Sequence, residues 1–383
     1  MSKPTTFVMV GAGGYAAMHV KNLLDPLMAS ECTLVAIVDP FARNSSLYPQ
    51  FKDLVPIYDS LEAFYAVGKA DVAFIATPIH LHLQQCITAM ENGSHVLCEK
   101  PLVPTMAEWE ILKAKTIATG KTLAVAFQWC HSHVMQGVKA RILAGEFGAP
   151  LRFKTYVSWP RGWKYFARSW AGKIATEDGR LIHDSVLTNA TAHYLQNTLF
   201  LLGDTMVESA TLTDVETQCY RVNPIETFDT IALKGKAAGA EVFFTASHAT
   251  NYKLWHPAMD YTFEKARILT SFAQQDGLCV IHHGDGRVEE LGSGVGNGLW
   301  DRIAYTAQSA KGLRPWCCTI DTVKPFTQLI DHVFSHVPVQ NFPEAYVVHD
   351  NTEELTYVKQ LHLDLMDCYH AGKLPTEMGF GWC

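Results

Sequence analysis

The sequence predicts an α/β fold in two domains: an N-terminal doubly wound parallel sheet and a C-terminal α+β domain with a large, mainly antiparallel sheet. Over the first 128 residues, short apolar segments alternate with amphipathic helical segments, which is typical of a parallel sheet covered by helices on both faces. Apolar runs such as Val72–Ala76 fit strands buried on both faces. Beyond residue 150, strand candidates follow one another with few helices between them, which indicates antiparallel pairing.

Length and composition agree with this organisation. The chain has 383 residues, of which 48% are hydrophobic and 18% charged, so it has the composition of a globular protein of two or three domains. With a net charge of −7, the chain has no overall excess of positive charge that would attract nucleic acid or an anionic membrane. No apolar run has the length of a membrane helix, and the ten cysteines are dispersed without a C-x-x-C pair. The first residues lead into a strand without the apolar region of a signal peptide, so we expect none. We therefore expect reduced thiols in a cytoplasmic protein.

The elements of the first domain can be placed in order. The predicted strands are Phe7–Val10, Leu34–Val38, Val72–Ala76, His95–Cys98 and Thr122–Phe127. The predicted helices between them are Ala16–Leu27, Ser60–Val67, His82–Asn92 and Met106–Thr119. Several of these helices end at a glycine or a polar break, which is a common stop signal.

A glycine-rich turn follows the first strand and opens the first helix. Its sequence, Gly-Ala-Gly-Gly-Tyr-Ala, matches the dinucleotide fingerprint G-x-G-x-x-A. The fingerprint needs Gly11 for a tight turn and Gly13 so that backbone can approach a pyrophosphate, while the helix N-terminus supplies amide donors. A carboxylate at the end of the second strand binds ribose hydroxyls in such sites. The predicted cofactor contacts here are Gly11, Gly13, Gly14, Tyr15, Ala16 and Asp39.

Asp39 also favours one cofactor over another. A carboxylate at this position repels a 2′-phosphate, so it favours NAD over NADP. The next two residues, Pro40 and Phe41, offer no cation, although Arg43 could still reach a phosphate. We expect NAD.

Two further turns carry a family resemblance. A Thr-Pro-x-x-x-His turn begins at Thr77, and a Glu-Lys-Pro turn follows the next strand at Glu99. Together with the glycine-rich loop, these turns resemble the Gfo/Idh/MocA oxidoreductases, which include glucose–fructose oxidoreductase and inositol dehydrogenases. The resemblance is dense over the first domain and thinner over the second, and the Glu-Lys-Pro turn is its most specific mark.

The resemblance implies a Rossmann domain over residues 1–128 and a substrate-binding domain over 129–383, whose open antiparallel sheet pairs subunits into a homodimer or homotetramer. It further implies cofactor contacts at Thr77, Pro78, His82, Glu99, Lys100 and Gln128. For the second domain we predict strands at Leu151–Ser158, Val207–Thr213, Thr230–Leu233, Glu241–His248, Tyr261–Phe263 and Leu278–His282. The predicted helices are Leu187–Leu202, Asp301–Lys311, Thr322–Ser335 and Glu353–Ala371.

The family carries an Asp-x-x-x-His pair on a helix of the second domain. Aligned on the helix end at Gly203, the corresponding residues of this chain are Asn189 and His193. Four residues apart, they would share one helical face, but an amide holds no negative charge. Asp184 and Ser185, just upstream, replace glycines of the usual motif and could supply that charge.

These residues predict the oxidation of a secondary alcohol, which moves a hydride to NAD and a proton to a base. His193 titrates near neutrality and is our candidate acid/base. Lys100, at the carboxyl end of a parallel strand, is the candidate electrostatic partner or proton relay, and Asn189 would orient them. Whether the lysine or the histidine takes the proton first is left open.

The segment Ser158–Trp170 is rich in aromatic and cationic residues. Such interleaving also occurs in nucleic-acid sites, but one short stretch in an acidic chain favours a loop facing a sugar, whose C–H faces stack on aromatic rings. The alternative is an interface or core loop. The predicted substrate contacts are Trp163, Tyr165, Arg168 and Asp184. His282, His283 and Asp285 resemble metal ligands but fall at a predicted hairpin turn, so we predict no metal site.

The leading hypothesis is therefore an NAD-dependent dehydrogenase acting on a hydroxyl of a sugar or cyclitol. Two alternatives stay open: an enzyme that cleaves glycosides through transient oxidation by bound NAD, and a non-catalytic regulator that senses NAD and sugar. Asn189 keeps the regulator open, whereas the presence of Lys100 and His193 argues against it.

Overall fold

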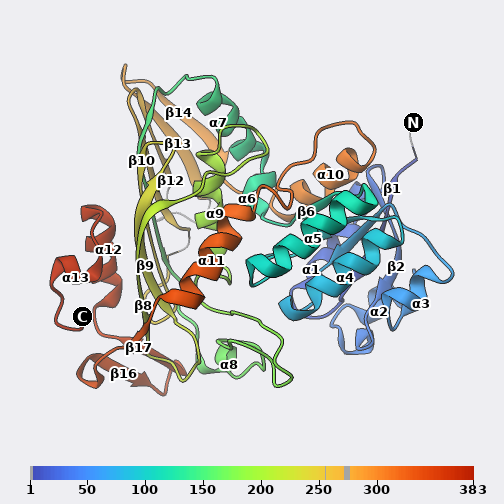
Figure 1. The fold of residues 1–383 in the computed structure, drawn as a ribbon, viewed down its shortest axis with the longest axis horizontal. Coiled ribbons are helices and arrows are strands. Elements are labelled where there is room, and N and C mark those ends of the chain that lie inside the picture. Colours follow the sequence, from blue (N-terminus) through green and yellow to red (C-terminus); the bar gives the residue numbers. More distant parts are fainter. Residues whose placement is uncertain (1–2, 255, 271–276) are drawn as a thin grey trace. The chain divides into compact units, whose positions relative to one another are not determined.

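The computed structural model describes residues 3–254, 256–270 and 277–383, which fold into two compact units (Figure 1). The first unit comprises Met1–His133 and Asn297–Thr327, and the second comprises Val134–Gly296 and Gln328–Cys383. This division differs from the predicted domains, which assigned all of residues 129–383 to the second one. Residues 297–327 instead return to the first unit.

The first unit is built on a six-stranded parallel sheet of order β3-β2-β1-β4-β5-β6. Every described pair in it is parallel, which confirms the predicted doubly wound sheet. Its strands are β1 (Thr5–Val10), β2 (Cys32–Val38), β3 (Ile57–Tyr58), β4 (Val72–Ile75), β5 (His95–Cys98) and β6 (Leu123–Val125). The order reverses between β1 and β4, and ligands of such sheets bind at the carboxyl ends beside this switch point.

The helices of the first unit follow local sequence signals. They are α1 (Ala16–Leu23), α2 (Tyr48–Phe51), α3 (Leu61–Tyr65), α4 (Ile79–Glu91), α5 (Met106–Thr119), α6 (Gln128–His131) and α10 (Leu299–Ala310). The Thr105 hydroxyl caps α5 by accepting from the Glu108 amide, and Gly120 ends that helix with a φ of 64°. Helix α1 is shorter than predicted because Asp25 caps a 3₁₀ turn that starts at Pro26.

Helix α10 belongs to the core of the first unit although it lies far along the chain. Its residues Ile303 and Ala307 are fully buried in the same apolar cluster as Phe7, Met9 and Val20 of the sheet and α1. Burial of such side chains contributes about 1.5–3 kcal/mol each. The Rossmann unit therefore depends on a helix that the chain supplies only after most of the second unit.

The second unit contains a nine-stranded sheet of order β14-β13-β12-β11-β7-β10-β9-β8-β15. Among its described pairs, β7–β10 and β8–β15 are parallel and the others are antiparallel, so the predicted mainly antiparallel sheet is confirmed. Its strands are β7 (Pro150–Ser158), β8 (Thr213–Arg221), β9 (Thr230–Ala237), β10 (Ala240–Ser247), β11 (Ala258–Phe263), β12 (Ala266–Thr270), β13 (Leu278–His283), β14 (Val288–Ser293) and β15 (Val339–Asn341). Its helices are α7 (His133–Leu143), α8 (Trp163–Phe166), α9 (Ala192–Leu201), α12 (Leu361–Ala371) and α13 (Pro375–Met378), and α11 (Lys324–His336) leads into it.

Two predicted elements of this unit are wrong. Residues 207–212 form no strand, because this segment packs on the end of α9, where the Ala210 amide donates to the Leu199 carbonyl at 2.8 Å. Gly203 permits this approach, since a Cβ there would lie 2.1 Å from the Glu208 carbonyl oxygen. The predicted helix Glu353–Ala371 begins instead as strand β17 (Leu355–Val358), which pairs with β16 (Val347–Asp350).

The C-terminal segment covers part of a sheet face that the sequence analysis expected to be open. Tyr156 of β7 donates from its hydroxyl to the His362 carbonyl at 2.9 Å and packs with Leu361, Leu365 and Trp382 in one buried cluster. Its neighbour Thr155 points to the other face, and Figure 1 shows α12 and α13 on one side of the sheet and α9 on the other. Pairing of subunits through this face stays a prediction, but α12 occupies it over β7 and β10.

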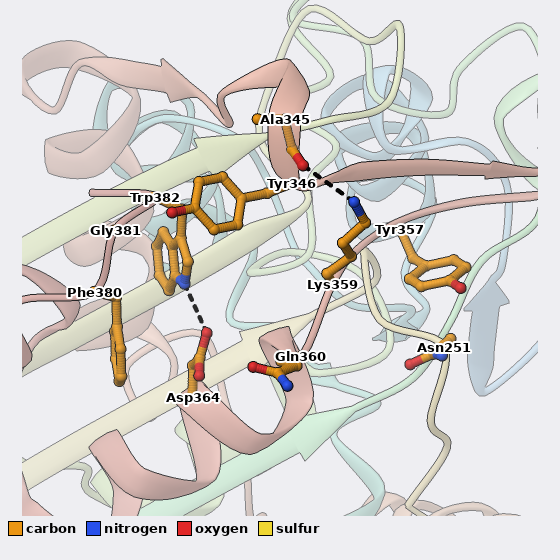
Figure 2. A pocket seen from close by; sticks show the side chains of 10 residues that line it. All are labelled: Asn251, Ala345, Tyr346, Tyr357, Lys359, Gln360, Asp364, Phe380, Gly381 and Trp382. Carbon is orange, nitrogen blue, oxygen red and sulfur yellow. Dashed lines mark hydrogen bonds between the residues drawn. The ribbon is translucent and has the colours of Figure 1, made fainter.

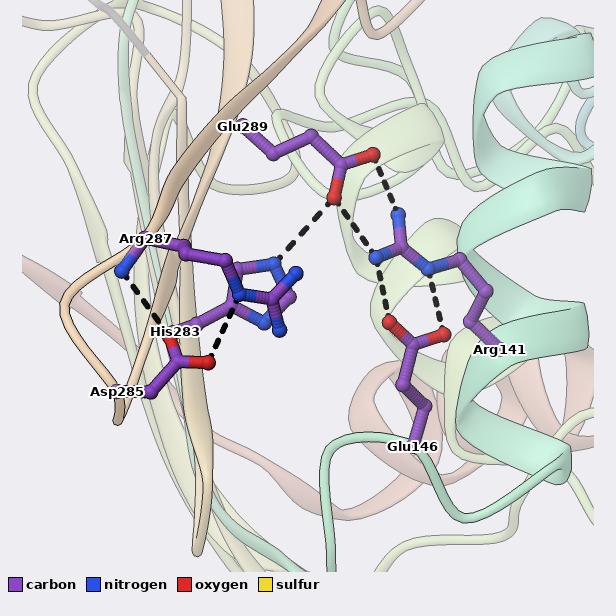
Figure 3. Close-up of polar contacts among 6 residues, drawn as sticks. All are labelled: Arg141, Glu146, His283, Asp285, Arg287 and Glu289. Atoms are coloured by element: carbon purple, nitrogen blue, oxygen red, sulfur yellow. Dashed lines mark hydrogen bonds and ion pairs between the residues drawn. The ribbon is translucent and has the colours of Figure 1, made fainter.

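A charged cluster joins α7 to the hairpin of β13 and β14 (Figure 3). Arg141 donates to both carboxyl oxygens of Glu146 at 2.6 and 2.8 Å, and to both of Glu289 at 2.8 and 2.9 Å. His283 lies 3.3 Å from Glu289, and Asp285 accepts from Arg287 in the turn. The hairpin that the sequence predicts at these histidines is confirmed. Within the described ranges, no cluster of three or more His, Cys, Asp or Glu side chains is arranged so that it could hold a metal ion.

No helix in the described part of the chain is long and apolar enough to cross a membrane.

Candidate active site

The glycine-rich turn after β1 forms an open backbone cradle. Gly11 has a φ of 96°, and a Cβ there would lie 2.8 Å from the Ala76 carbonyl oxygen, so only glycine fits. A Cβ on Gly13 or Gly14 would meet nothing within 4 Å. Their amides donate no hydrogen bond to the residues that the structure describes. Free amides at the start of α1 are the donors that a pyrophosphate requires, so the turn fits the predicted dinucleotide.

Asp39 ties the loop after β2 to this turn. One carboxyl oxygen accepts from the Ala12 amide at 2.8 Å, and the other accepts from the Phe41 amide at 2.7 Å. A carboxylate has about four acceptor positions, so two remain for the hydroxyls of a ribose. Arg43 is exposed on the 3₁₀ turn Ala42–Asn44.

His82 joins the Thr-Pro turn to the Glu-Lys-Pro turn. The ring is 1% exposed; its Nε2 lies 2.9 Å from the Thr77 carbonyl oxygen, and its Nδ1 lies 3.0 Å from that of Leu102. Burial lowers the pKa of His82, which opposes the effect of the carbonyl contacts. Both ring nitrogens thus contact backbone, and His82 positions the two turns rather than presenting a free nitrogen to a cofactor.

Glu99 lies at the centre of a buried charged network. Its Oε1 is 2.9 Å from His19 Nε2 and 2.9 Å from an amino nitrogen of Arg302, which also donates to the Ala126 carbonyl at 2.9 Å. Burial works to raise the pKa of Glu99, but the Arg302 guanidinium and His19 hold it well below its usual range. The other carboxyl oxygen accepts from the Lys100 amide at 3.1 Å, so the network fixes the backbone at the candidate catalytic lysine.

The predicted cofactor residues therefore follow one edge of the parallel sheet. They come after β1, β2, β4, β5 and β6 in turn, all at the carboxyl ends of the strands. Lys100 is half-buried beyond β5, in a cis peptide bond with Pro101. Gln128 is half-buried at the start of α6, while Tyr15 is 52% exposed. Pro78 immediately precedes α4.

The second unit groups three of its predicted site residues. The Asn189 amide group contacts the Tyr165 hydroxyl and lies 3.1 Å from Asp184 Oδ1. The other oxygen of Asp184 accepts from the Gly172 amide at 2.7 Å, and Asp184 is 4% exposed. Burial and the Asp184 charge raise the pKa of Tyr165, so its hydroxyl stays neutral. The carboxylate that position 189 lacks thus lies beside it, supplied by Asp184 as the sequence suggested.

Asn189 and His193 do not share a helical face, contrary to the prediction. Helix α9 begins only at Ala192, and Asn189 lies in the turn before it. There the backbone N–H of Asn189 donates to the Ser185 carbonyl. The Thr188 and Thr191 hydroxyls bond to backbone carbonyls five residues earlier. Such side-chain bonds compete with the helical pattern. His193 is 7% exposed on the first turn of α9.

Trp163 lies apart from this group. Its indole N–H donates to the Thr356 hydroxyl of β17 at 3.0 Å, and its amide donates to the Glu354 carbonyl. Trp163 therefore anchors α8 to the C-terminal hairpin. Arg168, in contrast, lies with its guanidinium 5.0 Å from the centre of the Tyr165 ring.

Sequence reasoning missed four residues of these groups: His19, Arg161, His248 and Arg302. Arg161 lies 5.1 Å from the Tyr165 ring, and the His248 ring is 6.1 Å from it. Arg161 stands in the aromatic segment that was singled out, so its position carried a signal. His248 at the end of β10, and Arg302 on α10, belong to no motif and become visible only in the fold.

A cavity of about 620 Å³ lies elsewhere in the second unit (Figure 2). It is lined by Tyr346, Trp382 and other C-terminal residues, and none of the predicted site residues contributes to it. Two of its polar groups are engaged with protein: Asp364 accepts from the Trp382 indole at 2.7 Å, and Lys359 donates to the Ala345 carbonyl at 3.2 Å. We do not assign the candidate site to it.

Burial of histidines predicts that the stability of the folded protein decreases as the pH is lowered. Burial lowers the pKa of His131 to about 4, below the ordinary value of about 6.5. Below pH 6.5 the unfolded chain takes up a proton that the folded chain does not, so stability falls as the pH drops. For His131 alone we expect a loss of about 1 kcal/mol between pH 7.5 and 5.5. Urea unfolding of wild type and His131→Gln at both pH values measures it, and an equal loss in both proteins would contradict this assignment.

Comparisons with known proteins agree with the first unit. Residues 5–127 match the model of the family described as "Oxidoreductase family, NAD-binding Rossmann fold". D-xylose 1-dehydrogenase (NADP(+)) 2 of Haloferax volcanii is 31% identical over 142 residues, which are 37% of this chain and 43% of that protein. Inositol 2-dehydrogenase of Renibacterium salmoninarum is 28% identical over 144 residues, with the same two coverages. The chain thus spans less than half the length of these curated relatives.

The similarity of fold to solved structures covers both units. The WlbA dehydrogenase from Bordetella pertussis, crystallised with NADH and UDP-GlcNAcA, superimposes with a TM-score of 0.68 at 21% identity, covering 87% of this chain and 96% of that one. The first unit is thus an NAD-binding Rossmann domain of the oxidoreductase class. Residues 5–127 thus match the Gfo/Idh/MocA oxidoreductase family, as the sequence resemblance indicated.

Proposed function

We propose that the chain is an NAD-dependent dehydrogenase that removes a hydride from a secondary hydroxyl carbon of a sugar or cyclitol. The observation that carries the proposal is the carboxyl edge of the parallel sheet. There the Gly13–Gly14 cradle follows β1, the Asp39 carboxylate follows the adjacent β2, and Lys100 follows β5 of the same sheet. The first two fit a dinucleotide, and a lysine at the same edge can stabilise the developing alkoxide.

NAD, when bound, supplies the hydride acceptor. The substrate hydroxyl loses its proton to His193 or through Lys100, the carbon loses its hydride, and a ketone remains. His193 suits the proton because a ring nitrogen of an imidazole can accept and release one. Tyr165 is kept neutral by burial and by Asp184, so we assign it a hydrogen-bonding role toward substrate rather than that of base. Asn189, which contacts Tyr165 and Asp184, would orient this group.

The names of the relatives support the substrate class. D-xylose 1-dehydrogenase acts on a sugar and inositol 2-dehydrogenase on a cyclitol. Both alignments are confined to about 43% of those proteins, so the particular sugar and carbon are open.

The proposal is tested with a panel of sugars and inositols, each supplied with NAD and NADP in parallel, while absorbance is followed at 340 nm. We expect NADH to form with at least one substrate. Release of nitrophenol from a nitrophenyl glycoside without net NADH would replace the proposal with glycoside cleavage. Binding of NAD without turnover on any substrate would favour the regulator.

Asp39 is the predicted determinant of cofactor choice. Replacing Asp39 with alanine removes both the ribose acceptor and the bond to the Ala12 amide, so affinity for both cofactors will fall. The repulsion of a 2′-phosphate disappears as well, and we expect the ratio of kcat/KM for NAD over NADP to fall by about tenfold or more. Steady-state kinetics with both cofactors measures this ratio. A wild-type enzyme that already prefers NADP would contradict the role given to Asp39.

A further inference from the structure

Two arginines lie against one aromatic ring in the second unit. The guanidinium carbons of Arg161 and Arg168 are 5.1 and 5.0 Å from the centre of the Tyr165 ring, and Arg168 is also 5.7 Å from that of Trp170. The hydroxyl of Tyr165 contacts Asn189. The two positive charges are therefore held beside the group proposed to bind substrate.

Neither arginine forms an ion pair with any residue that the structure describes. In the described part of the chain, four other arginines also lack an ion pair, namely Arg43, Arg152, Arg221 and Arg314. The remaining five pair with carboxylates: Arg141 with Glu146 and Glu289, Arg180 with Asp178, Arg267 with Asp260, Arg287 with Asp285 and Arg302 with Glu99. Asp184, the acid beside Tyr165, accepts from the Gly172 amide and from Asn189 instead. The two guanidinium groups thus have no direct carboxylate contact among the described residues, although the charge of Asp184 acts on the same tyrosine.

Arg161 also presents a buried donor. Its Nε is shielded from solvent and has no hydrogen-bond partner in the described part of the chain. A buried donor without a partner costs about 1–3 kcal/mol, and native structures seldom leave one unused. A ligand oxygen would satisfy it.

His248 presents the matching acceptor. Its Nδ1 lies 2.7 Å from the Trp159 carbonyl oxygen, so this nitrogen carries the proton and Nε2 has the lone pair. That Nε2 is buried and has no partner among the described residues, and the whole residue is 2% exposed. Burial and the nearby Arg161 charge lower the pKa of His248 to about 3, so the ring stays neutral. The Arg161 amide donates to the His248 carbonyl at 3.2 Å, which holds the two residues together.

We propose that the substrate of this dehydrogenase carries an anionic group, a carboxylate or a phosphate, bound by Arg161 and Arg168, with a substrate hydroxyl donating to His248 Nε2. The inference rests on the proposed function and names the substrate class of that site. A guanidinium binds carboxylate or phosphate oxygens through paired N–H donors, whereas a neutral polyol needs no positive charge. Arg168 is exposed, so it would meet the anion first and the half-buried Arg161 would hold it.

Matched substrates test the proposal directly. The panel compares glucose, glucuronate and glucose 6-phosphate, and the corresponding galactose series, by kcat/KM with NAD. We expect kcat/KM for one acidic substrate to exceed that of its neutral partner by about tenfold or more, because one charge-assisted hydrogen bond changes affinity by about this factor. The carboxylate and phosphate members distinguish the two sources of the anion.

Two variants assign the effect to the arginines. Arg161→Gln and Arg168→Gln should each raise KM for the acidic substrate by about 10–100-fold, which is a larger increase than for the neutral partner, while kcat for the acidic substrate changes little. Arg180→Gln is the matched control, because that arginine pairs with Asp178 on an exposed loop of the same unit and should leave all constants unchanged. His248→Phe should weaken acidic and neutral substrates alike, since it removes a hydroxyl acceptor.

Equal kcat/KM for acidic and neutral partners, or unchanged KM in both arginine variants, would overturn the proposal and leave the dehydrogenase assignment standing. The arginines would then only stack on Tyr165. If no substrate yields NADH, the dehydrogenase assignment fails, and titration of the protein with glucuronate and glucose 6-phosphate by calorimetry tests the anion site alone. Binding that the double variant Arg161→Gln/Arg168→Gln abolishes would support the site, and absence of binding would overturn it.

Discussion

Replacing Lys100 with methionine lowers kcat by about 10²–10⁴-fold while the affinity for NAD is little changed. Methionine keeps the length of the side chain but removes the charge that stabilises the developing alkoxide. The backbone at this position is held by the bond from the Lys100 amide to Glu99 and by the flanking His82 contacts, so the turn should persist. Steady-state kinetics and NAD titration by fluorescence measure the two effects separately.

His193→Asn should produce a loss of the same order, because an amide cannot take up the proton that the imidazole accepts. Lys113→Met is the matched control, since that lysine pairs with Asp321 at the surface of the first unit. Wild-type turnover in the Lys100 or the His193 variant would remove that residue from the mechanism. A loss of NAD binding in Lys100→Met would show that the lysine holds the cofactor rather than the reacting oxygen.

Replacing Arg302 with methionine destabilises the first unit by about 3–5 kcal/mol. Arg302 is fully buried and donates to Glu99 and to the Ala126 carbonyl, each at 2.9 Å. Without it, the buried Glu99 carboxylate loses its main counter-charge and takes up a proton more readily. Urea unfolding of the NAD-free protein measures the loss.

A double variant separates the charge from the packing. In Glu99→Gln/Arg302→Met no buried charge is left unpaired, so we expect it to be more stable than Arg302→Met alone. The pKa of Glu99 also predicts how stability depends on pH. Because the pKa of Glu99 is lowered in the folded state, the ionised carboxylate contributes to stability at a pH above the usual glutamate range. This contribution is lost as the pH falls below that range. A loss below 1 kcal/mol in Arg302→Met, or no recovery in the double variant, would contradict the role of the pair.

The first unit could be predicted well because its signals are local. Glycines that need positive φ or close approach, such as Gly11, and apolar runs such as Val72–Ile75 are written in neighbouring residues. The short strand β3 (Ile57–Tyr58) was missed because two residues carry no periodicity. The return of α10 could not be predicted, since Ile303 and Ala307 complete a core whose other members lie hundreds of residues earlier.

The candidate site also has residues that the sequence could predict and residues that it could not. The glycine-rich turn and Asp39 were predicted from the spacing of a fingerprint motif, whereas Thr77 to Lys100 were predicted from the family resemblance. The turn at Asn189 was predicted as helix because the hydroxyls of Thr188 and Thr191, which redirect the backbone, look like ordinary helical residues in the sequence. Arg302 and His248 act through contacts with distant segments, and no local pattern marks such partners.

Direct transfer of hydride is the central claim, and isotope labelling tests it most directly. An accepted sugar or cyclitol, deuterated at the carbon that bears the oxidised hydroxyl, is incubated with NAD and the protein, and the products are analysed by mass spectrometry. The account predicts deuterium-labelled NADH and an equimolar ketone. Unlabelled NADH, or a labelled substrate that is cleaved with its deuterium retained and no ketone released, would contradict it.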